Sequence, residues 1–276
     1  MHRIFKKINV FPVSIVRKVY GILVMLMFVC IGCQWHLKPT ETDASDNIRI
    51  QRFDRIEMLY LTTGDYSALQ QMKTYFPTET RVLLEDMLHL GRVDDSDISS
   101  RFLFFFQDST LQQMLGDVQQ QYTNMDDIDE QLTDAFNRLK REIPDIELPN
   151  VYAQIGSFDQ SIVVSGGALG ISLDKYLGTD YPFYVSHYGE EQRQLMERDM
   201  IVPDCLSFYL LSIYPLPKGN KQTDRDRHMG RIMWVVNRLV QRHVFDNKYV
   251  DRAATFIQHH SRITIDEFLK DNTTKL

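Results

Sequence analysis

The sequence predicts an α+β fold that is predominantly helical, with a small antiparallel β-sheet or hairpin. Apolar residues recur with helical spacing over residues 65–143 and again over residues 203–244. Between these stretches, residues 151–173 combine β-branched residues with glycines, as strands and turns do. A chain of 276 residues is long enough to bury one sizeable core without disulfides. We therefore expect a single globular domain over residues 48–276.

The first half of this domain is predicted to be mainly helical. Ile48–Phe53 alternates apolar and polar residues, as a half-buried strand does. Asp65 is placed to cap a helix, which Pro77 separates from a second one. Residues 101–108 (RFLFFFQD) fit either a short buried strand or a helix, because periodicity does not distinguish the two. The clearest helix is Asp126–Ile143, which has acidic first turns, basic last turns and one apolar face.

The β region consists of two apolar stretches separated by a turn. Val151–Ile155 and Ser161–Leu173 flank a turn around Ser157–Gln160, and this spacing predicts a hairpin. The glycines of the second stretch lack the Walker and Rossmann phosphate-binding patterns, so they indicate a bulge or a close backbone approach. They are Gly166, Gly167 and Gly170.

The chain is predicted to return to helices after the β region. Pro203 is suited to be the first residue of one helix, and Arg231–Val244 has the apolar spacing of another. Cys205 would then lie in a first helical turn, where a thiol pKa is lowered. Cysteine is commonly a small buried residue, and no histidine is near Cys205 in the sequence. A structural role is therefore favoured over a nucleophilic one.

The N-terminus has the layout of an export signal. The first eighteen residues carry five basic and no acidic residues, and an uncharged run follows from Val19 to Ile31. As a helix, this run is roughly 20 Å long, which is short of the hydrocarbon core of about 30 Å. It ends in Cys30-Ile31-Gly32-Cys33, which resembles the lipobox read by lipoprotein signal peptidase. We predict a lipoprotein signal peptide over residues 1–32 and lipid attachment at Cys33; the alternative is an uncleaved membrane anchor.

Residues 33–47 are predicted to form a polar, lipid-anchored tether. Gln34, rather than an acidic residue, follows Cys33, which favours the outer membrane with the domain facing the periplasm. Removing the five basic residues of the signal peptide from 31 leaves 26 Lys and Arg against 37 Asp and Glu, a formal charge of −11. An acidic domain repels phosphates, so we expect a membrane partner through the acyl anchor and no nucleic acid.

An aromatic segment near residues 176–188 is the main candidate for binding. Such a segment is costly to expose unless something covers it. It either covers the core of the domain or binds a ligand or an envelope protein partner, and the sequence supports both interpretations equally. The candidate residues are Tyr181, Phe183, Tyr184, His187 and Tyr188.

The sequence contains no complete catalytic or metal-binding motif. His187 and Glu190 have metal-compatible side chains, but a solvated loop explains them as well. His259 and His260 are adjacent, so on a helix they would point about 100° apart and could not share a metal. No nucleophile elbow is present either. We therefore assign no catalytic residue, no metal ligand and no cofactor.

Several motifs are similar to those of the gliding-motility-associated lipoprotein B (GldB) family. They are the IxRFD-type opening at residues 50–54, the YFP sequence ending at Pro77 and, most specific, GISLDKYLGTDYPFY at Gly170–Tyr184. The similarity extends from about Ile48 to Val244. The resemblance implies an envelope lipoprotein of Gram-negative gliding bacteria and their non-gliding relatives, without established catalytic activity. It also implies a fold remotely similar to zincin-like metallopeptidases, in a degenerate form.

The zincin resemblance allows a direct check of the enzyme interpretation. Zincins carry His-Glu-x-x-His on a helix, and its two histidines bind zinc. No histidine of this chain is followed by glutamate, and Asp199–Ile213 offers Asp204 and Cys205 without a histidine. We therefore expect a non-catalytic envelope lipoprotein that binds or assembles with a gliding or secretion apparatus. The alternatives are a zinc metallohydrolase with an atypical ligand set and a periplasmic ligand-binding lipoprotein.

Overall fold

The computed structural model describes residues 47–216 and 221–270. The predicted signal peptide, Cys33 and nearly all of the predicted tether lie outside these residues. The described part of the chain is α+β and predominantly helical, as predicted. None of its helices is both long enough and apolar enough to cross a membrane.

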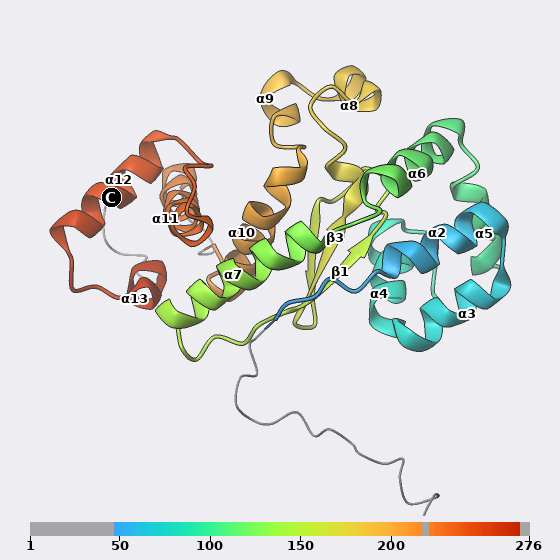
Figure 1. The fold of residues 1–276 in the computed structure, drawn as a ribbon, viewed down its shortest axis with the longest axis horizontal. Helices are drawn as coiled ribbons and strands as arrows, with labels where there is room; N and C mark the ends of the chain where they lie inside the picture. Colours follow the sequence, from blue (N-terminus) through green and yellow to red (C-terminus); the bar gives the residue numbers. More distant parts are fainter. Residues whose placement is uncertain (1–46, 217–220, 271–276) are drawn as a thin grey trace, which may run out of the picture. The chain divides into compact units, whose positions relative to one another are not determined.

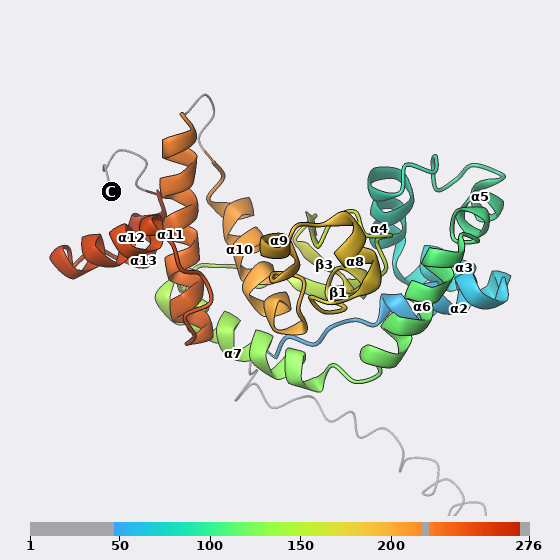
Figure 2. The same ribbon diagram turned by 90° about the horizontal axis from the view of Figure 1, so that it is seen from above.

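Helices precede and follow a small sheet along the chain (Figure 1). Those before the sheet are α2 (Phe53–Thr63), α3 (Tyr66–Tyr75), α4 (Pro77–Arg81), the π-helix η1 (Val82–Met87), α5 (Ile98–Phe105), α6 (Ser109–Gln121) and α7 (Asp126–Glu142). Those after it are η2 (Leu173–Lys175), α8 (Pro182–His187), α9 (Glu190–Arg193), η3 (Arg198–Met200), α10 (Ile201–Ile213), α11 (Gln222–Val240), α12 (Lys248–His259) and α13 (Ile265–Lys270). Helix α2 contacts β1, whereas α10 contacts β2 and β3, so the sheet lies between them (Figure 2).

The sheet has three strands in the order β1-β3-β2. Strand β1 (Asn150–Gln154) runs parallel to β3 (Ala168–Ser172), and β2 (Ile162–Ser165) runs antiparallel to β3. Gly166 and Gly167 join β2 to β3 with φ angles of 56° and 80°. Positive φ at both positions of a two-residue turn matches the twist of antiparallel strands, and glycine adopts it without steric cost.

The predicted strand pairing is wrong. The second predicted stretch, Ser161–Leu173, contains two strands, and its first glycines form a turn rather than a bulge. Val151–Ile155 therefore does not form a hairpin with the stretch that follows it. Instead the chain crosses from β1 to the far side of β3, and β3 lies between the two strands that the sequence predicted as neighbours.

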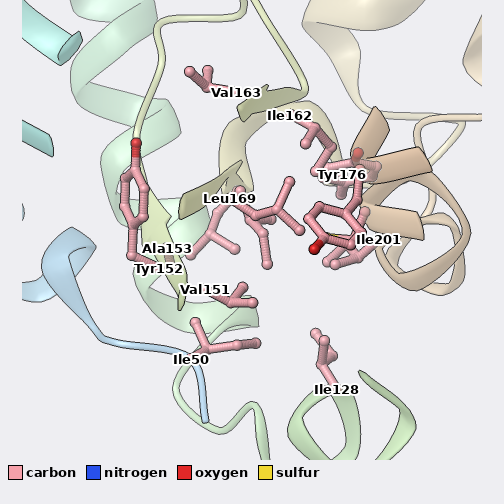
Figure 3. Packing of buried hydrophobic residues seen from close by; sticks show 14 of the residues in the cluster. Ile50, Ile128, Val151, Tyr152, Ala153, Ile162, Val163, Leu169, Tyr176 and Ile201 are labelled. Atoms are coloured by element: carbon pink, nitrogen blue, oxygen red, sulfur yellow. The ribbon is translucent and has the colours of Figure 1, made fainter. Parts of the chain in front are cut away.

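The two faces of the sheet pack against different elements (Figure 3). Val151 and Leu169 point toward Ile201 of α10, whereas Tyr152 and Val163 point to the opposite side. All five side chains are buried. Alternate residues of each strand therefore pack on opposite faces of the sheet. Because both faces are covered, the strands do not alternate between apolar and polar residues.

Local signals account for several helices. Asp65 caps α3 by accepting the backbone N–H of Ser67 at 2.8 Å, as predicted. Helix α7 confirms the predicted helix from Asp126, with acidic residues in its first turn and Lys140 and Arg141 in its last. The ambiguous RFLFFFQD run is largely helical and forms most of α5.

The predicted strand before α2 is reduced to one parallel bridge between Gln51 and β1. Its alternating burial is confirmed, since Ile48 and Ile50 are buried. Side chains of α7 take the neighbouring backbone amides, however. The N–H of Ile48 donates to Thr133 Oγ1 at 3.0 Å, and the N–H of Ile50 donates to Asp129 Oδ1 at 2.9 Å. The N–H of Gln51 faces β1, so these bonds satisfy the amides on the opposite side of the segment and join it to α7.

The predicted bounds of the last helices differ from the structure. Helix α10 begins at Ile201, two residues before Pro203, which is compatible with a proline in the first turn. Helix α11 begins at Gln222, nine residues before the predicted start at Arg231. The added residues include several charged side chains, so they carry little of the apolar periodicity on which the prediction rested. The helix ends where Gln241 adopts a left-handed conformation.

Helices α11 and α12 approach closely at Gly230. An added Cβ there would lie 2.5 Å from the Cβ of Tyr249 and 2.7 Å from its backbone carbonyl carbon. Backbone atoms cannot move aside as the end of a side chain can. At Gly116 in α6, by contrast, an added Cβ would meet no atom within 4 Å.

We expect Gly230→Ala and Gly116→Ala to change stability in opposite directions. Gly230→Ala would push α12 away from α11 and lower the free energy of unfolding by about 1–3 kcal/mol. Gly116→Ala would restrict the unfolded chain and raise that free energy by about 0.4–1 kcal/mol. Urea unfolding followed by circular dichroism measures both changes. A stabilising Gly230→Ala would contradict the close approach of the two helices.

Candidate functional site

The loop that leaves β1 is held by two carboxylates. The backbone N–H of Ile155 donates to Glu57 Oε2 at 2.9 Å. The N–H of Gly156 donates to Asp174 Oδ1 at 2.6 Å, and the N–H of Phe158 donates to Asp174 Oδ2. Glu57 belongs to α2 and Asp174 to η2. The hydrogen bonds of this loop therefore connect α2 to η2.

The loop also has a strained backbone. Ser157 and Phe158 adopt φ angles of 52° and 66°, a left-handed region that residues with a side chain rarely occupy. Gly156 is confined as well, because an added Cβ there would lie 2.7 Å from Ser172 Oγ. The carboxylate–amide hydrogen bonds stabilise a conformation that the loop would not adopt by itself.

Both carboxyl groups are completely buried. Burial raises the pKa of Glu57 well above its usual value despite the bond from Ile155, and the nearby charges of Asp174 and Asp54 raise it further. Burial also raises the pKa of Asp174, against the effect of its two amide hydrogen bonds. Glu57 Oε1 has no hydrogen-bond partner among the described residues, so ionisation of this group would be costly.

Three rings extend from this loop to the surface in one stack. The Phe158 and Phe183 centroids lie 4.0 Å apart with an interplanar angle of 12°. Phe183 stacks in turn on His187, with centroids 4.1 Å apart and an angle of 16°. The His187 Nδ1 lies 2.8 Å from both the carbonyl oxygen of Phe183 and the hydroxyl oxygen of Ser186. The stack therefore links buried Phe158 to exposed His187.

Tyr184 belongs to the core. Its side chain has no exposed surface. Its hydroxyl donates to the carbonyl oxygen of Asp174 and accepts the backbone N–H of Leu177 at 3.2 Å. Tyr184 therefore connects the start of α8 to the same residue that holds the β1–β2 loop.

Two further tyrosines anchor α8 while remaining half-buried. The Tyr181 hydroxyl donates to Asp117 Oδ2 in α6 at 2.9 Å. The Tyr188 hydroxyl donates to the carbonyl oxygen of Phe158 at 3.2 Å. Lys175 donates to both the Phe158 carbonyl and the Tyr188 hydroxyl, and its Nζ lies 4.7 Å from the centroid of the Tyr188 ring. These contacts fix both ends of α8.

Residues 178–197 form an excursion from the domain that we call the α8–α9 segment (Figure 1). Two hydrogen bonds close its base. The N–H of Gly178 donates to the carbonyl of Met196 at 3.0 Å, and the N–H of Thr179 donates to Glu197 Oε1 at 2.7 Å. The segment therefore begins and ends at one point, from which α8 and α9 extend.

Part of this segment is apolar and exposed. Val185 and Leu195 are 54% and 49% exposed, and half-buried Tyr181, Phe183 and Tyr188 belong to the same segment. The aromatic residues thus differ in exposure. Tyr184 covers the core, whereas the half-buried rings contribute to the surface.

The structure also locates the other candidate groups. His187 is exposed, and Glu190 is the first residue of α9. Within the described ranges, no three His, Cys, Asp or Glu side chains are grouped so that they could hold a metal ion. Cys205 is fully buried, and burial together with the charge of Asp204 raises its thiol pKa well above the usual value. This environment agrees with the structural role favoured for Cys205.

Sequence reasoning did not identify Glu57, Phe158 or Asp174 as parts of the site. Glu57 resembles an ordinary solvated acid on a helix, and its burial depends on the distant β1–β2 loop. Phe158 lies in a segment that the sequence predicts only as a turn. Asp174 lies inside the GISLDKYLG block, and that block was the one available signal for it.

A second buried carboxyl lies just beyond this block. Tyr176 donates its hydroxyl proton to Asp204 Oδ2 of α10 at 2.8 Å. Burial raises the pKa of Asp204 from its usual 3.8 to about 6, although the bond from Tyr176 acts against the rise. Asp204 therefore changes its charge close to neutral pH.

The fold and this site define a class of protein. It is a helical α+β domain with a small mixed sheet and an aromatic segment whose base is fixed by hydrogen bonds. Residues 34–248 match the family described as Gliding motility protein GldB. The chain therefore belongs to the GldB family, as its GISLDKYLGTDYPFY block indicated, and is a gliding-motility-associated envelope lipoprotein. Neither a curated protein nor a solved structure matches it significantly.

The pKa of Asp204 predicts a specific pH dependence of stability. Since its pKa is higher in the folded than in the unfolded state, the folded state is favoured at low pH. Stability falls as pH rises from about 4 through 6, by up to about 3 kcal/mol for a shift of this size. Asp204→Asn should lack this part of the decline. Urea unfolding of both proteins between about pH 4 and pH 7 measures the difference.

Tyr176→Phe provides the matched control. Removing the hydroxyl donor should raise the pKa of Asp204 further and move the loss of stability to higher pH. Parallel pH profiles for the wild-type protein and Asp204→Asn would show that this carboxyl does not titrate as described.

Proposed function

We propose that this protein is a non-catalytic envelope lipoprotein whose α8–α9 segment binds another envelope protein, as a component of a gliding or secretion apparatus. The observation that carries the proposal is a fixed aromatic and aliphatic surface in a chain of the GldB family. Aromatic side chains held rigidly at a surface are typical energetic centres of protein interfaces, because little conformational entropy is lost on binding.

The supporting structure is unusually well fixed for an exposed segment. Hydrogen bonds of Gly178 and Thr179 close its base, and the Phe158–Phe183 stack and the Tyr184 hydroxyl join α8 to the core. Polar and charged side chains adjoin the apolar ones along the segment. They are Ser186, His187, Glu190 and Glu191. An apolar centre with a polar rim is the usual anatomy of a specific interface.

The location of the protein forms the second part of the proposal. We infer that Cys33 is acylated, that the tether of residues 33–47 spaces the domain from the membrane, and that the domain faces the periplasm from the outer membrane. The lipobox-like sequence and Gln34 support this inference, as does the family of envelope lipoproteins to which the chain belongs. A short tether would keep the α8–α9 segment close to other envelope proteins.

Site-specific photo-crosslinking tests the interface. A crosslinking residue at Val185 should yield one discrete adduct with an envelope protein in intact cells. The same residue at Phe104, which is 75% exposed on α5, should not yield that adduct. Leu195→Glu should abolish the adduct at Val185, because a charge in an apolar interface must be desolvated. Adducts that are equal at the two positions, or unaffected by Leu195→Glu, would contradict the proposed surface.

Metabolic labelling with a fatty-acid analogue tests the anchor. Cys33→Ala should remove the label and leave either an unprocessed precursor or a soluble domain. Cys205→Ala is the matched control and should keep the label, because Cys205 is buried inside the domain. Unchanged labelling of Cys33→Ala would refute lipid attachment at this residue.

A further inference from the structure

A cavity of about 500 Å³ lies between α2 and the end of α6. Its size falls within the range of small-molecule sites in proteins. It is lined by Arg52 and Asp54, from the IxRFD-type opening, together with Arg55 and Leu59 of α2 and Thr123 beyond α6. No residue of the α8–α9 segment lines it. The cavity is therefore a separate candidate site.

Arg52 is held in a fixed position at this cavity. Its Nε donates to Asp54 Oδ1 at 2.8 Å, and its Nη2 donates to Asp54 Oδ2 at 2.7 Å and to the carbonyl oxygen of Tyr122 at 2.8 Å. The side chain of Asp54 is 3% exposed, whereas that of Arg52 is 21% exposed. Nη1 of Arg52 donates to no described residue and is not among the buried polar atoms that lack a partner. Its two N–H groups are therefore accessible to a ligand.

Arg55 adds a second guanidinium group three residues after Arg52. Residues at this spacing lie on the same side of a helix. Arg55 is exposed, and its Nη2 donates to the carbonyl oxygen of Thr123 at 2.8 Å. It forms no ion pair with any residue that the structure describes, whereas the charge of Arg52 is compensated by Asp54. One uncompensated positive charge therefore remains at this cavity, in a chain whose formal charge is −6.

The cavity also has an apolar part. Leu59 follows Arg55 by four residues on α2 and is 43% exposed, and Met58 lines the cavity as well. A ligand with an anionic group and an apolar body would contact both parts. A single uncompensated positive charge balances one carboxylate but not a doubly charged phosphate. Two planar guanidinium groups also match the planar geometry of a carboxylate.

We propose that this cavity binds a small carboxylate ligand with an apolar body. The carboxylate would accept N–H groups of Arg52 Nη1 and of Arg55, while the body would contact Leu59 and Met58. Because the Asp54 carboxylate and the Tyr122 carbonyl already fix Arg52, little side-chain entropy would be lost on binding. The site shares no residue with the proposed protein interface, so either proposal can fail without the other.

Isothermal titration with sodium 4-phenylbutyrate tests the proposal on the full chain. This probe combines an apolar body with one carboxylate, and 4-phenylbutan-1-ol is its neutral counterpart of similar shape. We expect saturable binding of the carboxylate and at least about fivefold weaker binding of the alcohol, as follows from about 1 kcal/mol of lost charge attraction. Equal affinities would overturn the anionic ligand, and no saturable binding of the carboxylate would overturn the site.

Two pairs of variants locate the binding. Arg55→Gln changes an exposed side chain, should leave the fold intact and should weaken binding of 4-phenylbutyrate about threefold to fivefold. Arg81→Gln removes an exposed guanidinium outside the cavity lining and should leave the affinity unchanged. Leu59→Ala should weaken binding about threefold, whereas Leu195→Ala, at a leucine 49% exposed on the α8–α9 segment, should not. Equal effects within either pair would place the binding elsewhere and overturn the site.

Discussion

The hydrogen bonds from the β1–β2 loop to the Glu57 and Asp174 carboxyl groups are the constraint on which most of the described architecture depends. The order β1-β3-β2 requires the chain to leave β1 and pass to the other side of β3. The backbone amides of this crossing loop are buried and have no neighbouring strand to accept their hydrogen bonds. Glu57 and Asp174 accept three of these amides. Removing either acceptor would leave buried donors unpaired, at a cost of about 1–3 kcal/mol each. Because the loop carries Phe158, the same hydrogen bonds also position the ring on which the α8–α9 segment stacks.

The parts of the fold that could be predicted are those with local physical causes. The α7 helix has apolar periodicity, acidic first turns and basic last turns, so every local signal agrees there. The strand pairing failed because pairing is not local: a two-residue Gly166-Gly167 turn and a glycine bulge give the same sequence pattern. Helix α2 was missed for a related reason. Its residues follow an alternating stretch that resembles a strand, although that stretch makes only one bridge to β1 among the described residues and is joined to α7 through the amides of Ile48 and Ile50.

The candidate site, too, could be predicted from the sequence only in part. Its aromatic residues were predictable, because Tyr181, Phe183 and Tyr188 are too many large rings for an ordinary solvated loop. Their division between core and surface was not, since it depends on which hydroxyl reaches a buried partner. Tyr184 reaches the Asp174 carbonyl and becomes core, whereas Tyr181 reaches Asp117 and stays half-buried. Sequence spacing carries no information about such partners, which are ten residues distant for Tyr184 and 64 for Tyr181.

The α8–α9 segment and the C-terminal helices differ in their relation to the family match. The α8–α9 segment lies within the matched residues 34–248, so a role shared by GldB proteins can rest on it. Helices α12 and α13 lie almost wholly after residue 248, yet they are integral to the domain. Gly230 of α11 admits Tyr249 of α12, and Phe268 of α13 is completely buried. The packing of the C-terminal helices is therefore a property of the whole chain, and the family match covers the α8–α9 segment without extending over these helices.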